Sequence, residues 1–266
     1  MRFVLPEVEQ RLARLEIPFN RDGIDPFGLS RDHLAKFLSM LTFFYRHYFR
    51  CTARGVENVP VRGRAMLVGN HSGGYAIDAG MLIASAFLEL EPPRLAQGMV
   101  EKFLSRMPLA GTWLQRTGQF TGLPEHCTRL LEEERLLMVF PEGARGTAKL
   151  FVERYSLVRF GTGFMRLALA TSTPIVPFAF LGGGEAVPTV VNLERVGKMV
   201  GLPYVPVTPY GLAVPLPVHV ELHFGEPMQF RGTGNEDDVE ILHKVDDVKR
   251  KISTLIDRGL RRYAPT

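Results

Sequence analysis

Short apolar runs alternate with longer stretches of helical spacing along this chain, and that alternation limits the fold more than any other feature. The runs Ala65–Gly69, Leu137–Phe140 and Ile175–Phe180 are apolar enough to be buried strands. The stretches Asp78–Leu90 and Gly161–Ala170 have the apolar spacing of helices. Strands that alternate with helices predict an α/β fold with a mostly parallel sheet flanked by helices. The other predicted elements are strands at Leu95–Val100 and Val218–Phe224 and helices around 101–116, 124–136 and Asp237–Leu260.

The length fits one domain of this class. At roughly 150 residues per domain the chain has room for one or two domains, and a single α/β domain is common at this size. Because 45% of the 266 residues are hydrophobic, the chain can bury a sizeable core, which excludes a disordered protein. We predict that residues 1–50 form an N-terminal helical segment and that residues 51–266 form the α/β domain.

The N-terminal segment contains two predicted helices, one over residues 6–16 and a longer one from its N-cap Ser30 to about Phe49. The longer helix carries an aromatic stripe that Met40 and Phe43 widen beyond the face that core packing needs. Two interpretations stay open. The helix either lies in a membrane interface or packs on the core with some aromatic side chains exposed.

Two nearly uncharged stretches, residues 160–184 and 199–218, raise the question of a membrane span. Glycines and prolines divide the first stretch into a helix and a strand. Five prolines interrupt the second, and a helix with five prolines cannot satisfy its backbone hydrogen bonds in lipid. Neither stretch is predicted to span a membrane. We predict that residues 199–218 form an apolar loop that either covers a ligand groove or touches lipid.

The cysteines and the N-terminus bear on the compartment. Cys51 and Cys127 are far apart and match neither a disulfide framework nor a zinc site, so we expect free thiols in a reducing compartment and no metal. Pro6, Glu7 and Glu9 stand where a secretory signal needs an unbroken apolar core. These features favour a cytoplasmic protein.

The net charge of +4 is unevenly distributed. Residues 46–64 hold five arginines and one glutamate, and residues 244–262 hold seven basic and three acidic residues. No base-stacking or groove-entering element accompanies either cluster, so we predict no nucleic-acid partner. The first cluster follows the aromatic helix, which suits an anionic bilayer surface or lipid phosphates. The second cluster fits a solvated helix face equally well.

The first candidate site is the loop after the strand Ala65–Gly69. In parallel α/β sheets, ligands bind at the carboxyl ends of strands, where His71 projects. Histidine side chains titrate near pH ~6.5 and can take a proton at neutral pH, while a carboxylate can hold the other ring nitrogen. His71 and Asp78 therefore form a sensible base and orienting pair. The alternative is that Asp78 is a helix N-cap and His71 an ordinary loop residue.

Two further motifs follow later strands. In the Gly-rich turn from Phe140 to Thr147, the Arg145 guanidinium suits a phosphate and Glu142 can accept a hydrogen bond from a hydroxyl. A surface turn with a local ion pair is the alternative. The stretch Pro174–Pro177 shows by itself only that an X-Pro turn enters a buried strand.

Together and in this order, the three motifs resemble those of the glycerolipid acyltransferases, the lysophospholipid acyltransferases of the 1-acylglycerol-3-phosphate type. The resemblance covers roughly residues 50–230. It implies that His71 is the general base and Asp78 its orienting partner. The resemblance also implies that the acceptor hydroxyl attacks an acyl thioester of CoA or acyl carrier protein without an acyl-enzyme intermediate. The implied substrate-binding residues are Asn70, Glu142, Gly143 and Arg145, with Arg145 at a phosphate.

The resemblance further implies that no cofactor or metal is required. The aromatic helix and the proline-rich apolar stretch lead us to expect a peripheral enzyme at the cytoplasmic face of a membrane, acting on a lipid acceptor. The developing charge on the thioester carbonyl needs a donor, for which a loop N–H near Ser72–Gly74 is the candidate.

Two positions depart from the family pattern. Six residues separate His71 from Asp78, where the family usually has four, so the sequence leaves open whether the two side chains meet. Leu123 occupies the place of an arginine that helps the family hold the acceptor phosphate. Either Arg116 or Arg129 could substitute for it, and Arg116 is taken as a substrate-binding candidate.

Other classes are less compatible with the sequence. No Gly-x-Ser-x-Gly elbow of an α/β-hydrolase occurs, and neither does a complete Gly-x-Gly-x-x-Gly or Walker loop. A non-catalytic lipid-binding or lipid-transfer protein on the same scaffold is the remaining alternative.

Overall fold

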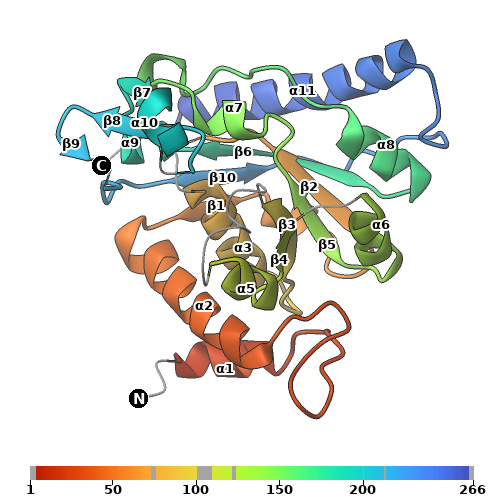
Figure 1. Cartoon of the computed structure of the whole chain (residues 1–266). Coiled ribbons are helices and arrows are strands. Elements are labelled where there is room, and N and C mark those ends of the chain that lie inside the picture. The colour runs from red at the N-terminus through yellow and green to blue at the C-terminus, as the bar shows by residue number, and fades with distance from the viewer. Residues whose placement is uncertain are drawn as a thin grey trace.

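A seven-stranded sheet forms the centre of the molecule, in the order β1-β10-β6-β2-β5-β3-β4 (Figure 1). The computed structural model describes residues 4–72, 76–100, 110–121, 124–199, 201–212 and 214–263. The strands of the sheet are β1 (Thr52–Arg54), β2 (Ala65–Gly69), β3 (Ala96–Val100), β4 (Gln119–Thr121), β5 (Leu136–Val139), β6 (Ile175–Leu181) and β10 (Glu221–Phe224).

Five neighbouring strands of this sheet, from β6 to β4, run parallel. Strand β10 runs antiparallel to β6 and carries β1 parallel to itself. Every residue of β2, β5 and β6 is buried, as expected for strands covered on both faces. The predicted α/β fold with a mostly parallel sheet is confirmed.

Helices cover the two faces of the sheet in separate layers (Figure 1). On one face α3 (Ile77–Glu89) contacts the sheet, α2 (Arg31–Phe43) packs on α3, and α1 (Pro6–Leu12) packs on α2. The other face is covered by α6 (Pro124–Glu132), α8 (Gly163–Ala170) and α11 (Asp238–Leu260). Two hydrophobic clusters, one on each face, form the core.

The long C-terminal helix α11 shows how its sequence determines its position. Asp237 caps the helix by accepting a hydrogen bond of 2.8 Å from the Glu240 N–H. Apolar side chains then recur every three or four residues and form one buried stripe on the sheet. The stripe consists of Ile241, Val245, Val248, Ile252, Leu255 and Ile256.

The N-terminal helix departs from the prediction at its end. The expected single helix to Phe49 is α2 followed by a π-helical turn over Phe44–Tyr48. Leu34 and Leu38 are buried in the hydrophobic cluster that also contains residues of β2 and α3, whereas Met40 and Phe43 are 43% and 50% exposed. The helix therefore packs on the core and exposes part of its apolar surface.

A second, smaller sheet corrects the prediction that residues 199–218 form one loop. It has three antiparallel strands, β7 (Val191–Leu193), β8 (Val205–Thr208) and β9 (Gly211–Leu212). Pro206 lies in β8 opposite Asn192. The fixed φ of proline excludes helix interiors but is compatible with an extended strand, so the prolines that argued against a helix did not exclude β structure.

The remaining short elements connect the main ones. They are η2 (Val56–Asn58), α5 (Ala110–Arg116), α7 (Ala144–Thr147), η3 (Phe151–Glu153), α9 (Gly183–Ala186) and α10 (Glu194–Met199). Among the described residues, none of the helices combines the length and the apolar character that a membrane crossing needs.

The fold pairs three of the five arginines of the basic cluster of residues 46–64 with carboxylates. Arg46 pairs with Glu7 at 2.5 Å, and Arg62 pairs with Glu16 at 2.7 Å. Arg54 lies 3.3 Å from Glu221. These carboxylates come from distant parts of the sequence, so the local excess of arginine does not by itself make a basic face.

Candidate active site

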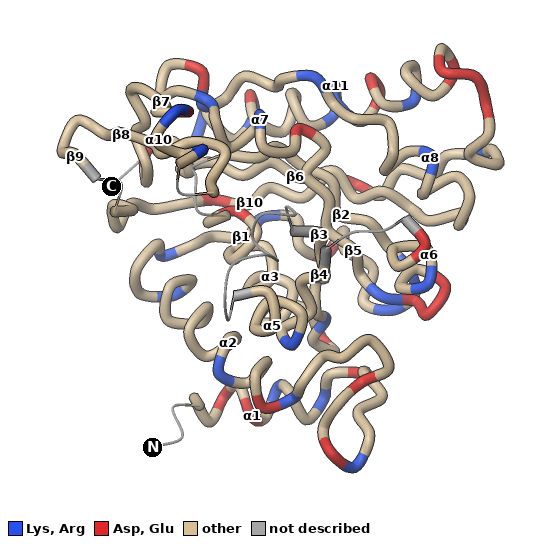
Figure 2. Tube along the Cα trace, viewed as in Figure 1, with Lys and Arg blue, Asp and Glu red and all other residues tan. Residues whose placement is uncertain are grey.

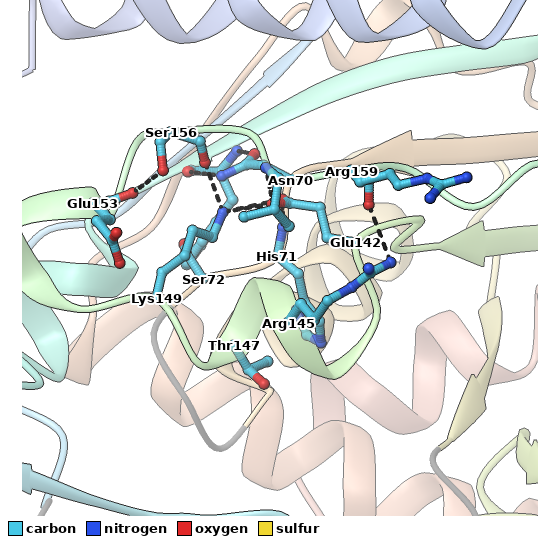
Figure 3. A network of polar contacts seen from close by, with 12 residues as sticks. Asn70, His71, Ser72, Glu142, Arg145, Thr147, Lys149, Glu153, Ser156 and Arg159 are labelled. Atoms are coloured by element: carbon cyan, nitrogen blue, oxygen red, sulfur yellow. Dashed lines mark hydrogen bonds and ion pairs between the residues drawn. The ribbon is translucent and has the colours of Figure 1, made fainter. Parts of the chain in front are cut away.

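The loops after β2 and β5 meet at one edge of the sheet (Figure 3). Because the two strands are parallel neighbours, their carboxyl ends lie side by side, and ligands of α/β sheets bind at that edge. His71 follows β2 and Glu142 follows β5. The backbone N–H of His71 donates a hydrogen bond of 2.9 Å to the Glu142 Oε1, which joins the two loops directly.

Asp78 reaches His71 despite the longer spacing. The His71 Nδ1 lies 2.5 Å from the Asp78 Oδ2, and Asp78 is fully buried in the first turn of α3. The residue before the helix, Ala76, has a φ of 52°, so the chain turns sharply into α3. Asp78 lies within the helix rather than at its N-cap, which excludes the alternative role as a cap.

Further hydrogen bonds fix the Asp78 carboxylate. Its Oδ2 accepts from the Ser72 N–H at 2.9 Å, and its Oδ1 accepts from the Ala79 N–H at 2.8 Å. A carboxylate only accepts, so the His71 Nδ1 donates its N–H to Asp78, and in the neutral imidazole the Nε2 keeps its lone pair. Among the described residues, no group forms a hydrogen bond with that Nε2.

Packing holds the imidazole ring in place. The ring of His71 stacks on Phe140, with centroids 4.3 Å apart and an interplanar angle of 24°. Phe140 in turn meets the edge of Phe178 at 5.7 Å. The backbone of Gly146 also approaches so closely that a Cβ there would lie 2.6 Å from the His71 Cβ. The Gly-rich turn therefore serves a close backbone approach.

Glu142 joins the histidine loop to two other segments of the chain. The sequence predicts a contact with substrate, but Glu142 is 1% exposed and its oxygens are used inside the protein. Besides the His71 N–H, it accepts hydrogen bonds from the Val158 N–H at 3.0 Å and from the Lys149 Nζ at 2.9 and 3.0 Å. Glu142 thus holds the backbone of the histidine loop.

Lys149 is the residue that sequence reasoning missed. Its side chain is 3% exposed, and its Nζ also donates to the Ser156 carbonyl at 2.9 Å (Figure 3). A buried lysine must be paired and hydrogen-bonded. The two oxygens of Glu142 and the Ser156 carbonyl meet that requirement. A lysine seven residues after Glu142 carries no sequence signal unless the burial of the glutamate is already known.

Asn70 is likewise a structural residue. Its Nδ2 donates to the Phe180 carbonyl at 3.0 Å, and its Oδ1 accepts from the Phe180 N–H at 2.7 Å. The amide thereby extends the pairing of β2 with β6 by one step beyond the end of β2. Asn70 is fully buried, and both polar atoms of its amide are engaged within the protein.

Gly143 and Arg145 lie on the rim of the site. Gly143 has φ 58° and ψ −153°, values that favour glycine, and it starts the turn that leads into α7. Arg145 is exposed, and its Nη2 lies 3.5 Å from the Arg159 carbonyl. Figure 3 shows its guanidinium directed away from Glu142, toward Arg159. Its remaining donors are accessible to a ligand.

The sequence of this region decides the family. Residues 50–181 match the family model Acyltransferase, a segment that contains both loops of the site. An uncharacterised protein of Mycobacterium tuberculosis is 32% identical over 249 residues, which covers 90% of this chain and 70% of that protein. The chain belongs to the acyltransferase family. A relative from Mycobacterium leprae, also uncharacterised, is 33% identical over 248 residues, which covers 89% of this chain and 68% of that protein.

Two further comparisons concern acyltransferases and lipid synthesis. An enzyme of Gallus gallus described as a DGAT1/2-independent enzyme synthesizing storage lipids is 27% identical over 181 residues, covering 66% of this chain and 51% of that enzyme. The crystal structure of the 1-acyl-sn-glycerophosphate acyltransferase PlsC from Thermotoga maritima shares the fold, with a TM-score of 0.59. That match covers 88% of this chain and 83% of the other at 15% identity. The predicted resemblance is confirmed in family and fold.

Arg116 does not reach the acyltransferase site. It ends α5 and precedes β4, and because β4 runs parallel to the strands of the site, its start lies at the opposite edge of the sheet. The guanidinium lies 3.3 Å from the His33 Nε2. The other candidate, Arg129, stacks over the Phe27 ring at 5.3 Å. Leu123 lies outside the described residues.

Ser72 is only partly available as a donor to an oxyanion. Its N–H is engaged by Asp78, whereas its buried Oγ has no hydrogen-bond partner among the described residues. Gly73 and Gly74 lie outside the described residues. The Ser72 side chain lines a narrow cleft that has no room for a water molecule in this structure; its other lining residues are Thr147, Lys149, Phe151, Arg154, Gly184, Val187 and Thr189.

The cysteines take no part in this site. Cys127 is buried in α6, and burial raises the pKa of its thiol to about 11. Burial also raises the pKa of Cys51. Within the described ranges, no group of three or more His, Cys, Asp and Glu side chains is arranged to hold a metal ion.

Proposed function

We propose that this acyltransferase moves a fatty acyl group from an acyl thioester to the hydroxyl of a lysophospholipid, with His71 as general base. The observation that carries the proposal is the 2.5 Å contact between the His71 Nδ1 and the buried Asp78. It fixes the tautomer in which Nε2 can accept a proton. The donor is acyl-CoA or acyl carrier protein, which enters as a substrate.

The proposed reaction is a direct transfer. The acceptor hydroxyl gives its proton to the His71 Nε2 as its oxygen attacks the thioester carbonyl carbon. The new C–O ester bond forms, the C–S bond breaks, and the thiolate takes the proton back from the imidazolium. Asp78 stabilises the imidazolium between the two steps. No metal or prosthetic group enters this scheme.

Arg145 is the proposed contact for the acceptor phosphate. Its guanidinium is exposed at the rim of the turn that also supports His71. A planar guanidinium can form two parallel hydrogen bonds with a phosphate, which fixes the acceptor's position as well as its charge. Glu142 and Asn70 are proposed as positioning residues, because their polar atoms are engaged within the protein.

We further propose that the enzyme works as a peripheral protein at the cytoplasmic face of a membrane, where lipid acceptors are found. Its free cysteines fit a reducing compartment. Fractionation of cells tests this placement: the expected result is recovery with membranes at low salt and release by high salt or mild detergent. Recovery outside the cytoplasmic compartment would contradict it.

The variant His71→Ala tests the proposed mechanism. Release of the carrier thiol is followed with acyl-CoA and with acyl carrier protein, each against a panel of lysophospholipids. We expect the variant to lose about 10²–10⁴-fold in rate, the usual contribution of a general base. The matched control is His243→Ala on the exposed side of α11, which should keep the wild-type rate. Wild-type release no faster than that of His71→Ala with every acceptor would contradict the proposal and favour a lipid-binding protein.

A further inference from the structure

The exposed apolar side chains of the molecule concentrate on one segment. Eight of the sixteen large hydrophobic residues that are exposed in the described part of the chain lie between residues 190 and 216. We call this set the β7–β9 apolar surface. It consists of Val190, Val191, Leu193, Val196, Met199, Tyr210, Val214 and Leu216.

The orientation of β7 shows that this exposure is built into the fold. Successive side chains of a strand point to opposite faces. Val191 and Leu193 are 45% and 40% exposed, whereas Asn192 between them turns inward and donates a hydrogen bond of 2.6 Å from its Nδ2 to the Ala148 carbonyl. The usual pattern of apolar residues inside and polar residues outside is inverted here. Exposed apolar side chains that gather in one segment mark a contact with another molecule or with a membrane.

The charges on this segment favour an anionic bilayer. Between residues 187 and 218 the only charged side chains are Glu194, Arg195 and Lys198, all on α10. Both basic residues are exposed beside Val196 and Met199, the latter 85% exposed. Figure 2 shows β8 and β9 free of charge. Apolar side chains flanked by lysine and arginine fit the boundary between lipid headgroups and acyl chains.

The segment is also tied to the catalytic loops. The Phe151 N–H donates to the Thr189 carbonyl at 2.8 Å, and Thr189 lines the same cleft as Ser72, the neighbour of His71. At its other end the Tyr48 hydroxyl donates to the Pro215 carbonyl at 2.6 Å, which links the segment to the end of the N-terminal helix. A bilayer on this surface would bring lipid next to the site, whereas a second copy of the chain would cover the approach.

We propose that the β7–β9 apolar surface inserts into the interface of an anionic bilayer and presents the site to membrane-held acceptor. The assignment of this surface to lipid rests on the proposed function, in which the acceptor is a lysophospholipid. In this proposal the β7–β9 apolar surface, and not the arginine cluster of residues 46–64, is the membrane-contacting region, because carboxylates neutralise three of those arginines.

Vesicle flotation of the full chain tests the surface. The vesicles contain equal parts of phosphatidylcholine and phosphatidylglycerol, and the variant is Val196→Asp with Met199→Asp. We expect the affinity of the variant for the vesicles to fall by about tenfold or more, because two apolar side chains are replaced by charges that anionic lipid repels. The control is Val239→Asp, an equally simple change at a 65% exposed valine on α11, which should bind like the wild type. Unfolding midpoints of all three proteins confirm that they are folded.

Wild-type protein that does not float, or a double variant that floats like the wild type, would overturn the inference. It is also overturned if sedimentation shows a wild-type dimer that the two substitutions dissociate, since the occupant is then a second copy. A second assay measures acyl transfer to a lysophospholipid dispersed as monomers. It distinguishes failure of the membrane-surface inference from failure of the proposed function. The inference predicts that the double variant keeps that rate and loses transfer only to vesicle-held acceptor, whereas failure of the proposed function removes both rates from the wild type.

Discussion

At the scale of single residues, the site contains a buried ion pair between Glu142 and Lys149. Glu142 and Lys149 are both almost fully buried, and the glutamate holds the backbone N–H of His71. Taking two charges out of water is costly, so such a pair contributes less to stability than to the fixed geometry around it. We interpret the pair as a clamp between the loops after β2 and β5.

Removing one partner of the clamp should lower the free energy of unfolding more than replacing both partners does. We expect Lys149→Met to lower the free energy of unfolding by about 3–5 kcal/mol, because it leaves a buried carboxylate unpaired. Glu142→Gln combined with Lys149→Met should recover part of that loss, because no buried charge remains, although the glutamine oxygen can accept from only one of the two backbone N–H groups of His71 and Val158. Urea unfolding of the two single variants and the double variant measures the coupling. Strictly additive effects would show that the pair does not act as a unit.

A second residue-scale prediction concerns Gly146, which packs against the histidine loop. A Cβ at Gly146 would lie 2.6 Å from the His71 Cβ and 2.8 Å from the Glu142 Cβ, so Gly146→Ala must displace one of them. We expect a loss of about 1–3 kcal/mol in stability from the overpacking. A displacement of the base by an ångström should also reduce kcat by roughly a hundredfold.

Gly163→Ala is the matched control for that change. Gly163 begins α8 and is exposed, and a Cβ added there would have no neighbouring atom within 4 Å, so alanine should be neutral or slightly stabilising. Equal kcat values for the two variants would show that the contact between Gly146 and His71 has no role in catalysis.

At the scale of elements, the strands that were predictable from the sequence are those that consist of a continuous run of apolar residues. The apolar runs of β2, β5 and β6 gave strand positions within a residue or two, and the apolar period of α11 gave the last helix. Strands β1 and β4 have three residues each and are defined by their neighbours in the sheet, so no local pattern marks them.

Strand β10 contains an acid-sensitive cluster. The pKa of His223 is lowered, mainly because burial disfavours its charged form. Burial pushes the pKa of Glu221 upward, but hydrogen bonds from Arg54 and His223 outweigh it and leave that pKa below its ordinary value. Both groups bind protons more weakly in the folded state than in the unfolded state.

The sign of the pH dependence follows from those directions. Stability from His223 is present above the unfolded pKa of 6.5 and decreases as pH falls below it, and the contribution of Glu221 decreases below pH 4.5. We expect His223→Gln to flatten the loss of stability that begins below pH 6.5, measured by urea unfolding across that range. His243→Gln on the exposed side of α11 is the control. An unchanged slope in His223→Gln would contradict the assignment.

At the scale of the whole molecule, the sequence brought the right loops together but could not assign their inner contacts. Parallel strands place His71 and the turn at Glu142 on one edge, and that much follows from the order of strands and helices. The burial of Glu142, by contrast, depends on Lys149 and on the loop through Val158, which no spacing rule connects.

The same scale explains why the sequence alone could not place the ion pairs of the arginines or the position of Arg116. Arg116 precedes β4, and only the position and direction of that strand place it at the far edge of the sheet. The arginines of residues 46–64 form a basic run in the sequence, but Glu7, Glu16 and Glu221 approach them only in the folded chain. Long-range pairing of this kind leaves no trace in local composition.

The central claim is that His71 and Asp78 act as one unit in acyl transfer to a lipid hydroxyl. The most direct test measures labelled acyl groups arriving on lysophospholipid, by mass spectrometry, for the wild type, His71→Ala, Asp78→Asn and the double variant. Residues that act as a unit lose activity non-additively. We predict that each single variant loses about 10²–10⁴-fold in rate and that the double variant loses little more. Full activity in either single variant, or losses that multiply in the double variant, would contradict the account.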